Sequence, residues 1–218
     1  VQGGAPAASG LVTHDHIDGV LFTGSWPVGR RILEANLDRP GRMIALEMGG
    51  NNAAIIMPDA DLKQAVIECV RSAFVTTGQR CTCTRRIIVH EAVAREFVPM
   101  FQRLTSTLVI GDPAGVAGQP VFMGPIIREE SLASGLAFQS DLLKAGGRPL
   151  IEATRIESPT RGHYISPGAV LVDRFSFATD ASRDAGCDVE TFAPIVRISV
   201  TNSLDDALAQ ANASRYGL

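Results

Sequence analysis

Short apolar runs alternate with amphipathic segments along most of this chain. Apolar runs of strand length occupy residues 17–22, 43–46, 53–57 and 86–89. Segments with apolar side chains at helical spacing lie between and after them, at 28–37, 59–76 and 93–104. Strands and helices that alternate in this way are typical of a parallel sheet covered by helices, so the pattern predicts an α/β fold.

The second half of the chain continues this pattern. Helices are expected over 129–145, where the Gly146–Gly147 pair ends the helix, and from Ser203 as N-cap to residue 213. Strands are expected near residue 150, over 169–172 and over 195–200. Two segments are predicted to lack regular structure: the small residues 3–10 and the Gly-rich and Pro-rich residues 111–124.

Two residues mark the starts of predicted helices. Pro27 fits the first turn of the helix over 28–37, where its missing N–H costs nothing. Asp59 is expected to cap the helix over 59–76, because its carboxylate can accept hydrogen bonds from the free N–H groups of a first turn.

Composition narrows the class of protein. The chain has 218 residues, of which 45% are hydrophobic and 20% charged, with a formal net charge of −3. This balance, with only 6% aromatic residues, argues against nucleic-acid binding, which needs a basic surface or stacking rings. No apolar run reaches about 18 residues and no secretion signal opens the chain, so we expect no membrane association and a cytoplasmic location.

The cysteines are too few and too unevenly spaced for a disulfide framework, so we expect reduced thiols at positions 69, 81, 83 and 187. The neighbours of Cys81 favour a reactive thiol, because Arg80 adds a positive charge that stabilises the thiolate and Gly78 allows close approach of a ligand. A buried structural cysteine is the other interpretation, and it fits Cys83, which leads into an apolar strand. A metal site is not expected, since no histidine has a spacing that would complete a zinc site.

Three further segments combine glycine turns with reactive or polar side chains. Glu47 ends an apolar strand beside a glycine pair, a place where α/β proteins often carry catalytic groups, although a solvated strand end is the simpler interpretation. Residues 22–29 form a glycine turn before a helix. Such a turn could bind a phosphate at the helix N-terminus, or it could simply connect a strand to a helix without binding a ligand. Residues 190–194 place a carboxylate and an aromatic ring ahead of a strand, and by themselves predict a loop entering an edge strand.

Taken in this order, the segments resemble the aldehyde dehydrogenase superfamily over nearly the whole chain. Residues 47–50 resemble its general-base motif E-L-G-G, and residues 78–81 resemble its nucleophile motif G-Q-x-C. Residues 190–194 resemble its cofactor-ribose motif E-x-F-G-P, with Ala193 in place of glycine. The amino-acid sequences of residues 45–52 and 78–83 are similar to those of the family's semialdehyde dehydrogenases of arginine catabolism.

The resemblance implies a role for each of these residues. Cys81 would attack the aldehyde and carry the acyl group as a thioester, and Glu47 would activate the water that hydrolyses it. NAD would be the cofactor, with NADP possible, and the residues implied to contact it are Gly24, Ser25, Trp26, Pro27, Val28, Gly29, Glu190 and Phe192.

The resemblance also implies partners: a small aldehyde substrate and further copies in a homo-oligomer, with no nucleic acid, membrane or metal. Cys83 has no catalytic role. Arg80, Arg85 and Arg86 would either bind substrate carboxylates or serve the structure, and the structural role is favoured.

The implied fold is an aldehyde dehydrogenase-like α/β catalytic domain with a parallel sheet, preceded by the tail of a Rossmann-like nucleotide-binding domain. Residues 1–46 are expected to be the C-terminal part of the NAD-binding domain, and residues 47–218 a catalytic domain that is incomplete at its C-terminus. Because the chain starts at Val1 and ends without a polar tail, we expect a piece of a longer enzyme that is inactive alone. The family's cofactor lysine and oxyanion asparagine would precede residue 1.

Two other hypotheses remain open at this point. The chain could be a noncatalytic folded module that lacks half of a cofactor site. It could also be a thiol hydrolase, which would need a histidine base beside Cys81, and the four candidates are His14, His16, His90 and His163.

Overall fold

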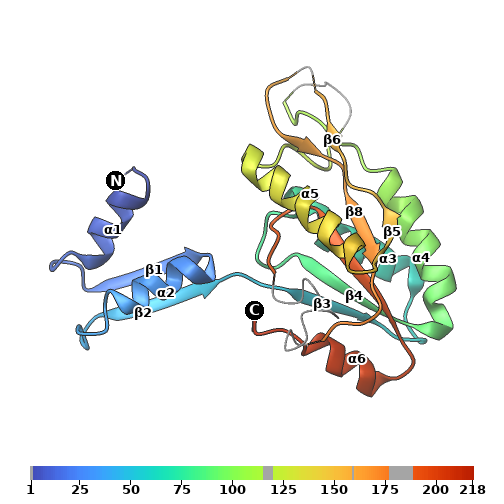
Figure 1. Ribbon diagram of the computed structural model, residues 1–218, viewed down its shortest axis with the longest axis horizontal. Coiled ribbons are helices and arrows are strands. Elements are labelled where there is room, and N and C mark those ends of the chain that lie inside the picture. The colour runs from blue at the N-terminus through green and yellow to red at the C-terminus, as the bar shows by residue number, and fades with distance from the viewer. Residues whose placement is uncertain (1, 115–119, 159, 177–188) are drawn as a thin grey trace. The chain divides into compact units, whose positions relative to one another are not determined.

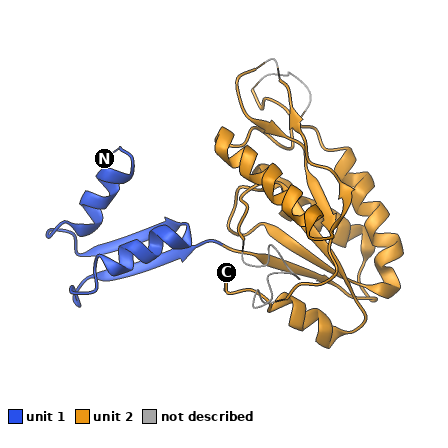
Figure 2. Cartoon of the chain, in the orientation of Figure 1, with its two compact units in different colours: residues 1–49 blue, residues 50–218 orange. Residues whose placement is uncertain are grey.

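A computed structural model describes residues 2–114, 120–158, 160–176 and 189–218. Two compact units make up the chain, Val1–Gly49 and Gly50–Leu218 (Figure 2). The sequence placed a domain boundary between residues 46 and 47. That the first unit belongs to a nucleotide-binding domain stays a prediction.

The first unit contains a strand–helix–strand element. β1 (Gly19–Gly24) and β2 (Met43–Met48) pair in parallel, and α2 (Trp26–Glu34) connects them and packs on both. Pro27 lies in the first turn of α2, as predicted. This arrangement confirms the predicted alternation of strand and helix.

The prediction that residues 3–10 lack structure is wrong, because they contribute to a helix, α1 (Ala5–Thr13). Pro6 fits the first turn of that helix, and three alanines supply the strongest intrinsic helix preference. None of its residues is buried, so the helix has no apolar stripe from which the sequence pattern could have predicted it.

The second unit is built on a five-stranded sheet (Figure 1). Its strand order is β3 (Asn52–Ile56), β4 (Thr84–His90), β9 (Ile195–Thr201), β8 (Gly168–Leu171) and β5 (Arg148–Ile151). The first four strands run in parallel, and β5 pairs antiparallel with β8. The predicted parallel α/β fold is therefore confirmed, with one antiparallel strand at its edge.

Helices cover both faces of this sheet. α3 (Leu62–Phe74) and α4 (Glu91–Ser106) pack on the face that carries Ile87 and Val89. α5 (Glu129–Lys144) packs against Val170, and α6 (Leu204–Ala211) packs against Ile88, both on the opposite face. Neighbouring residues of one strand point to opposite faces, so the continuous apolar run in β4 serves both helical layers.

Three details differ from the sequence predictions. Asp61 caps α3, because its carboxylate accepts hydrogen bonds from the Lys63 and Gln64 N–H groups, whereas Asp59 lies too early in the chain. β9 lies between β4 and β8, so the expectation of an edge strand after residue 194 is wrong. A short antiparallel pair, β6 (Arg155–Ile156) and β7 (Tyr164–Ile165), was not predicted, since two residues per strand give no periodic signal.

The other predicted elements are confirmed within a few residues, including the helix that Ser203 caps. Part of the predicted loop over 111–124, and Cys187, lie outside the described residues.

Candidate functional site

Cys81 lies in a turn between α3 and β4 that begins with left-handed backbone. After α3 ends, a short 3-10 segment (Val75–Gly78) carries positive φ angles at Thr76 (54°), Thr77 (56°) and Gly78 (67°). Glycine adopts such angles freely, but a β-branched threonine is strained there. These left-handed residues turn the chain sharply between α3 and β4, so that Cys81 lies just before the start of β4. We call residues 78–83 the Cys81 turn.

Two side chains hold the carbonyl groups of the Cys81 turn. Asn52 donates from Nδ2 to the Cys81 oxygen (2.6 Å) and to the Cys83 oxygen (3.2 Å). Arg85 donates from one guanidinium nitrogen to the Gly78 oxygen and, at 3.2 Å, to the Arg80 oxygen. The turn therefore has its carbonyls directed at buried or half-buried donors.

Within the described part of the chain, the N–H groups of Cys81 and Thr82 have no hydrogen-bond acceptor. Unpaired N–H groups beside a thiol can stabilise negative charge that develops on an oxygen bonded to the same carbon as the sulfur. The Cys81 turn therefore combines a half-buried thiol with neighbouring N–H groups that are free to bind an oxygen.

The three described cysteines differ in their surroundings. Cys69 and Cys83 are buried, and Cys81 is half-buried. Burial, with a smaller effect of Glu68, raises the pKa of Cys69 to about 12, which keeps that thiol protonated and unreactive. The structural interpretation of Cys83 agrees with its burial.

A second loop, residues 189–194, meets the Cys81 turn; we call it the Glu190 loop. A Cβ atom on Gly78 would lie 2.5 Å from the Ala193 carbonyl oxygen, so the two backbones touch at this point and leave no room for a side chain. Phe192 has a φ of 48°, and the residue is 40% exposed. Two segments distant in the sequence thus pack directly against each other.

Glu190 is anchored at the same place. Its Oε1 accepts a hydrogen bond from the Gly50 N–H (3.1 Å), and Gly50 in turn contacts the Cys81 turn, since a Cβ there would lie 2.2 Å from the Cys81 oxygen. Burial raises the pKa of Glu190, and the Gly50 N–H and the charge of Arg85 partly offset this effect. The structure therefore brings together Cys81 and Glu190, two of the residues that the sequence singled out.

The three arginines near Cys81 separate into two groups. Arg80 is exposed, whereas Arg85 and Arg86 are buried and donate to backbone carbonyls. The structural role favoured for Arg85 and Arg86 agrees with these contacts. Of the three, Arg80 is the one whose exposure suits contact with a substrate.

The remaining predicted site residues lie in the first unit. Glu47 is exposed near the end of β2 and pairs with Thr23 of β1. Ser25 stands at the N-cap of α2 without a side-chain hydrogen bond to the helix, so its hydroxyl is available to a ligand. Trp26 and Val28, on either side of Pro27, are both exposed.

The glycines of this segment also have packing roles. A Cβ atom on Gly29 would lie 2.2 Å from the Met48 sulfur, and one on Gly24 would lie 2.4 Å from the Phe22 ring. Gly29 is buried and lets α2 lie close to β2, which is one reason for glycine whether or not a phosphate binds there.

The hydrogen bonds by which Asn52 and Arg85 hold backbone carbonyls of the Cys81 turn were not predicted from the sequence. Asn52 follows the glycine pair at the start of β3, and an amide next to a proposed catalytic motif was the available signal. The carbonyls that both residues hold are backbone atoms, which leave no trace in a sequence pattern.

The thiol hydrolase hypothesis finds no support in the second unit. His90 lies at the opposite end of β4 from Thr84, about 20 Å along the strand, and its ring contacts the Asn202 carbonyl. His163 contacts the Glu129 carboxylate at 3.0 Å. The rings of His14 and His16 contact each other edge to face in the first unit, with their centroids 5.3 Å apart.

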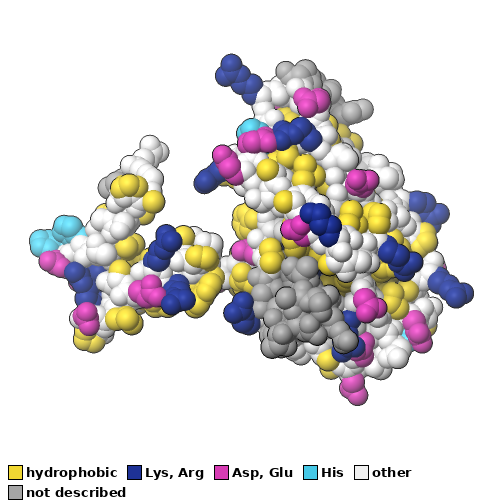
Figure 3. Space-filling view, viewed as in Figure 1, with side chains coloured by type: hydrophobic (Ala, Val, Ile, Leu, Met, Phe, Trp, Pro, Cys, Tyr) yellow, Lys and Arg dark blue, Asp and Glu magenta, His cyan; other side chains and the backbone are white. Residues whose placement is uncertain are grey.

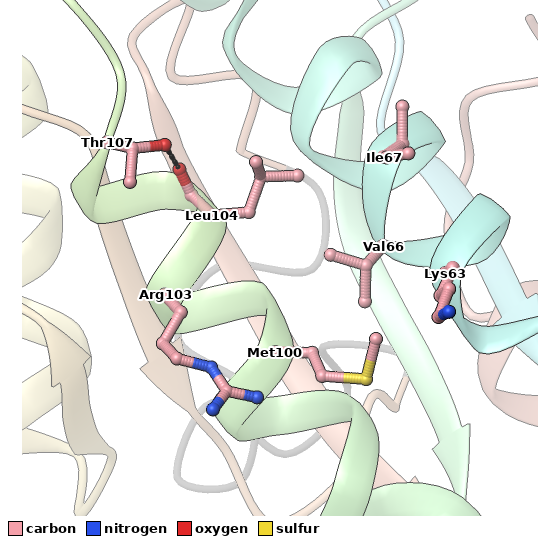
Figure 4. A pocket seen from close by; sticks show the side chains of 7 residues that line it. All are labelled: Lys63, Val66, Ile67, Met100, Arg103, Leu104 and Thr107. Carbon is pink, nitrogen blue, oxygen red and sulfur yellow. Dashed lines mark hydrogen bonds between the residues drawn. The ribbon is translucent and has the colours of Figure 1, made fainter.

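A groove of about 410 Å³ between α3 and α4 contains none of the predicted site residues (Figure 4). Its lining is mostly apolar and consists of Lys63, Val66, Ile67, Met100, Arg103, Leu104 and Thr107.

Over the described ranges, no group of three or more His, Cys, Asp or Glu side chains could hold a metal ion, and no helix is long and apolar enough to span a membrane. On the face shown in Figure 3, acidic and basic side chains are interspersed.

The whole chain is similar to known proteins. A family model described as the aldehyde dehydrogenase family matches residues 1–218. The N-succinylglutamate 5-semialdehyde dehydrogenase 1 of Caulobacter vibrioides is 40% identical over 100% of this chain and 44% of its own length. An N-succinylglutamate 5-semialdehyde dehydrogenase of Novosphingobium aromaticivorans is 36% identical over 99% of this chain and 43% of its own length. The chain thus spans less than half the length of the curated relatives it matches.

Solved structures of aldehyde dehydrogenases have a fold similar to that of this chain. The crystal structure of a cysteine-to-alanine mutant of aldehyde dehydrogenase C from Pseudomonas syringae, in complex with NAD+ and octanal, superposes with a TM-score of 0.87. It is 26% identical, and the match covers 100% of this chain and 43% of that one.

Proposed function

Because the chain belongs to the aldehyde dehydrogenase family, we propose that the protein containing it oxidises an aldehyde to a carboxylic acid with Cys81 as nucleophile. The observation that carries this proposal is the Cys81 turn. There a half-buried thiol stands beside unpaired N–H groups, and Asn52 and Arg85 hold the adjoining carbonyls. A cysteine held only for packing would not need this surrounding set of oriented backbone groups.

The proposed chemistry uses this chain's residues in two steps. The Cys81 thiolate bonds to the aldehyde carbon, and the N–H groups of the Cys81 turn donate to the oxyanion that forms. A bound NAD(P) would supply the acceptor for the hydride that leaves this carbon. Cys81 then holds the acyl group as a thioester. Glu47 takes a proton from water, the water oxygen bonds to the acyl carbon, the carbon–sulfur bond breaks, and the acid leaves.

The residues fit a nicotinamide cofactor. The second oxygen of Glu190 has no hydrogen-bond partner among the described residues, so it can accept from a ribose hydroxyl. Phe192 is an exposed residue, and its aromatic side chain can pack on a flat ring of the cofactor. In the first unit, the Ser25 hydroxyl stands at a helix N-terminus, which favours a phosphate group. We assign Gly24–Gly29 to the same cofactor.

For the substrate, we propose N-succinylglutamate 5-semialdehyde, an intermediate of arginine catabolism. Two curated relatives named for this substrate are 40% and 36% identical to the chain. The exposed Arg80 next to Cys81 can attract the carboxylates of such a molecule. Another semialdehyde remains the competing substrate. The proposed enzyme is a cytoplasmic homo-oligomer.

The test is a comparison of specificity constants in the complete protein. We expect the highest kcat/KM with N-succinylglutamate 5-semialdehyde, a lower one with neutral aldehydes of similar length, and a preference for NAD+ over NADP+. Cys81→Ser should form no NADH. Retained burst formation of NADH by Cys81→Ser would contradict the assigned nucleophile.

A separate experiment addresses the hypothesis of a noncatalytic module. Calorimetric titration of the 218-residue chain with NAD+ should give no strong binding if the module hypothesis holds for the isolated chain. Micromolar binding would reject it.

A further inference from the structure

We infer that Arg85 is a positioning residue that ties the Cys81 turn to the Glu190 loop, so that the two move together when a cofactor binds. The inference rests on the proposed function, because it assigns the Cys81 turn to the nucleophile and the Glu190 loop to the cofactor. The contacts themselves are independent of that assignment.

Arg85 is held between the two segments by three carbonyl groups. It is the second residue of β4 and is 3% exposed. One terminal nitrogen donates to the Gly78 and Arg80 oxygens of the Cys81 turn, and the other donates to the Ala193 oxygen of the Glu190 loop at 2.8 Å. A planar guanidinium with fixed donors can hold three such acceptors at once.

The carbonyls that Arg85 joins belong to residues whose backbones already touch. A Cβ atom on Gly78 would lie 2.5 Å from the Ala193 oxygen, 2.7 Å from its carbonyl carbon and 2.8 Å from the Pro194 nitrogen. Neither segment can therefore shift toward the other, and Arg85 resists their separation. A displacement of Glu190 or Phe192 on cofactor binding would be transmitted to the residues that precede Cys81.

The electrostatic setting of Arg85 is unusual for a residue that only fills space. Within the described residues, no carboxylate oxygen lies within 4.0 Å of it, and its Nε is buried without a hydrogen-bond partner. A buried charge without a close counter-ion is destabilising unless oriented dipoles compensate it. Here the compensating dipoles are the carbonyls of the two segments.

Arg86 provides a matched control. It is the next residue, it is 2% exposed, and it also donates to three carbonyls, those of Asn51, Gln210 and Ala211. None of these three lies in the Cys81 turn or the Glu190 loop. Loss of Arg86 should therefore destabilise the fold without separating those two segments.

The experiment compares Arg85→Met, Arg85→Lys and Arg86→Met in the complete protein. Alkylation of Cys81 by iodoacetamide is followed by peptide mass spectrometry with and without NAD+, and the melting temperature and the KM for NAD+ are recorded. For wild type we expect NAD+ to change the Cys81 alkylation rate. Arg85→Met should abolish this NAD+ effect and change the basal alkylation rate by about tenfold or more, since displacements of about 1 Å alter reactivity strongly. Arg85→Lys should restore part of the effect.

Arg86→Met should lower the melting temperature as much as Arg85→Met and keep the NAD+ effect. The inference is overturned if wild type shows no NAD+ effect, if Arg85→Met keeps it, or if Arg86→Met loses it equally. If Arg85→Met does not fold, Arg85→Lys decides, because an unchanged NAD+ effect and KM in that variant reject the positioning role. Failure of the proposed function has a different signature, an absence of aldehyde oxidation in wild type.

Discussion

Gly50 offers the sharpest test of how closely the Cys81 turn is packed. Its φ is not among the positive ones, so alanine would meet no backbone strain there, and space alone requires glycine. A Cβ atom would lie 2.2 Å from the Cys81 oxygen and 3.3 Å from the Cys81 carbonyl carbon. Ordinary contacts of carbon atoms are about 3.5 Å, so Gly50→Ala must displace the Cys81 carbonyl by roughly 1 Å.

The size of the effect follows from this displacement. Overpacking of this kind costs about 1–3 kcal/mol, which lowers the melting temperature of a chain this long by roughly 3–10 °C. The displacement also strains the 2.6 Å hydrogen bond from Asn52 to the Cys81 oxygen. A nucleophile moved by about 1 Å should reduce kcat/KM about 100-fold.

The assay is kcat/KM of the complete protein together with thermal unfolding. Gly41→Ala is the matched control, because Gly41 is exposed, has no atom within 4 Å of a built Cβ and has no positive φ. We expect wild-type activity and stability for it. Gly50→Ala with activity close to that of Gly41→Ala would refute the packing argument.

Three other predictions concern stability. Thr76→Asn should raise the free energy of unfolding by about 1 kcal/mol, because asparagine tolerates the φ of 54° better than a β-branched residue; an unchanged denaturation midpoint would contradict this. Asp61→Ala should lower the free energy of unfolding by about 1 kcal/mol, because Asp61 caps α3, and Asp59→Ala should have little effect. Urea unfolding of both variants measures this difference. A larger loss of stability in Asp59→Ala would contradict the observed cap. Burial raises the pKa of Glu190 above its usual 4.5, so the folded state holds this proton more tightly and the ionised carboxyl destabilises the fold. Glu190→Gln should therefore gain stability over wild type as pH rises from below 4.5 through the raised pKa, with weaker NAD+ binding; a gain that is constant with pH would contradict this.

The sequence predicted most of the second unit because its elements carry strong periodic signals. The apolar run in β4 and the stripe on α3 identify a buried strand and a helix by themselves. α1 and the short strands β6 and β7 give no such signal, since α1 has no buried residues and each strand is two residues long. The wrong prediction of an edge strand after residue 194 has another cause, because strand order depends on contacts between distant parts of the chain.

The candidate site was predictable in its side chains and not in its backbone. Cys81, Glu47 and Glu190 stand out as chemical groups next to glycine turns. The left-handed angles at Thr76 and Thr77, and the carbonyls that Asn52 and Arg85 hold, do not follow from residue type. Threonine is among the residues least expected at a positive φ, so the turn that precedes Cys81 could not be predicted from the sequence.

The central claim is that the Cys81 sulfur carries the acyl group between oxidation and hydrolysis. The most direct measurement is mass spectrometry of the acid-quenched complete protein after one turnover with substrate and NAD+, with Glu47→Gln used to slow hydrolysis. We predict an acyl adduct on the peptide that contains Cys81, formed in step with one equivalent of NADH and absent in Cys81→Ser. NADH formed at the wild-type rate with no adduct on that peptide would contradict the account.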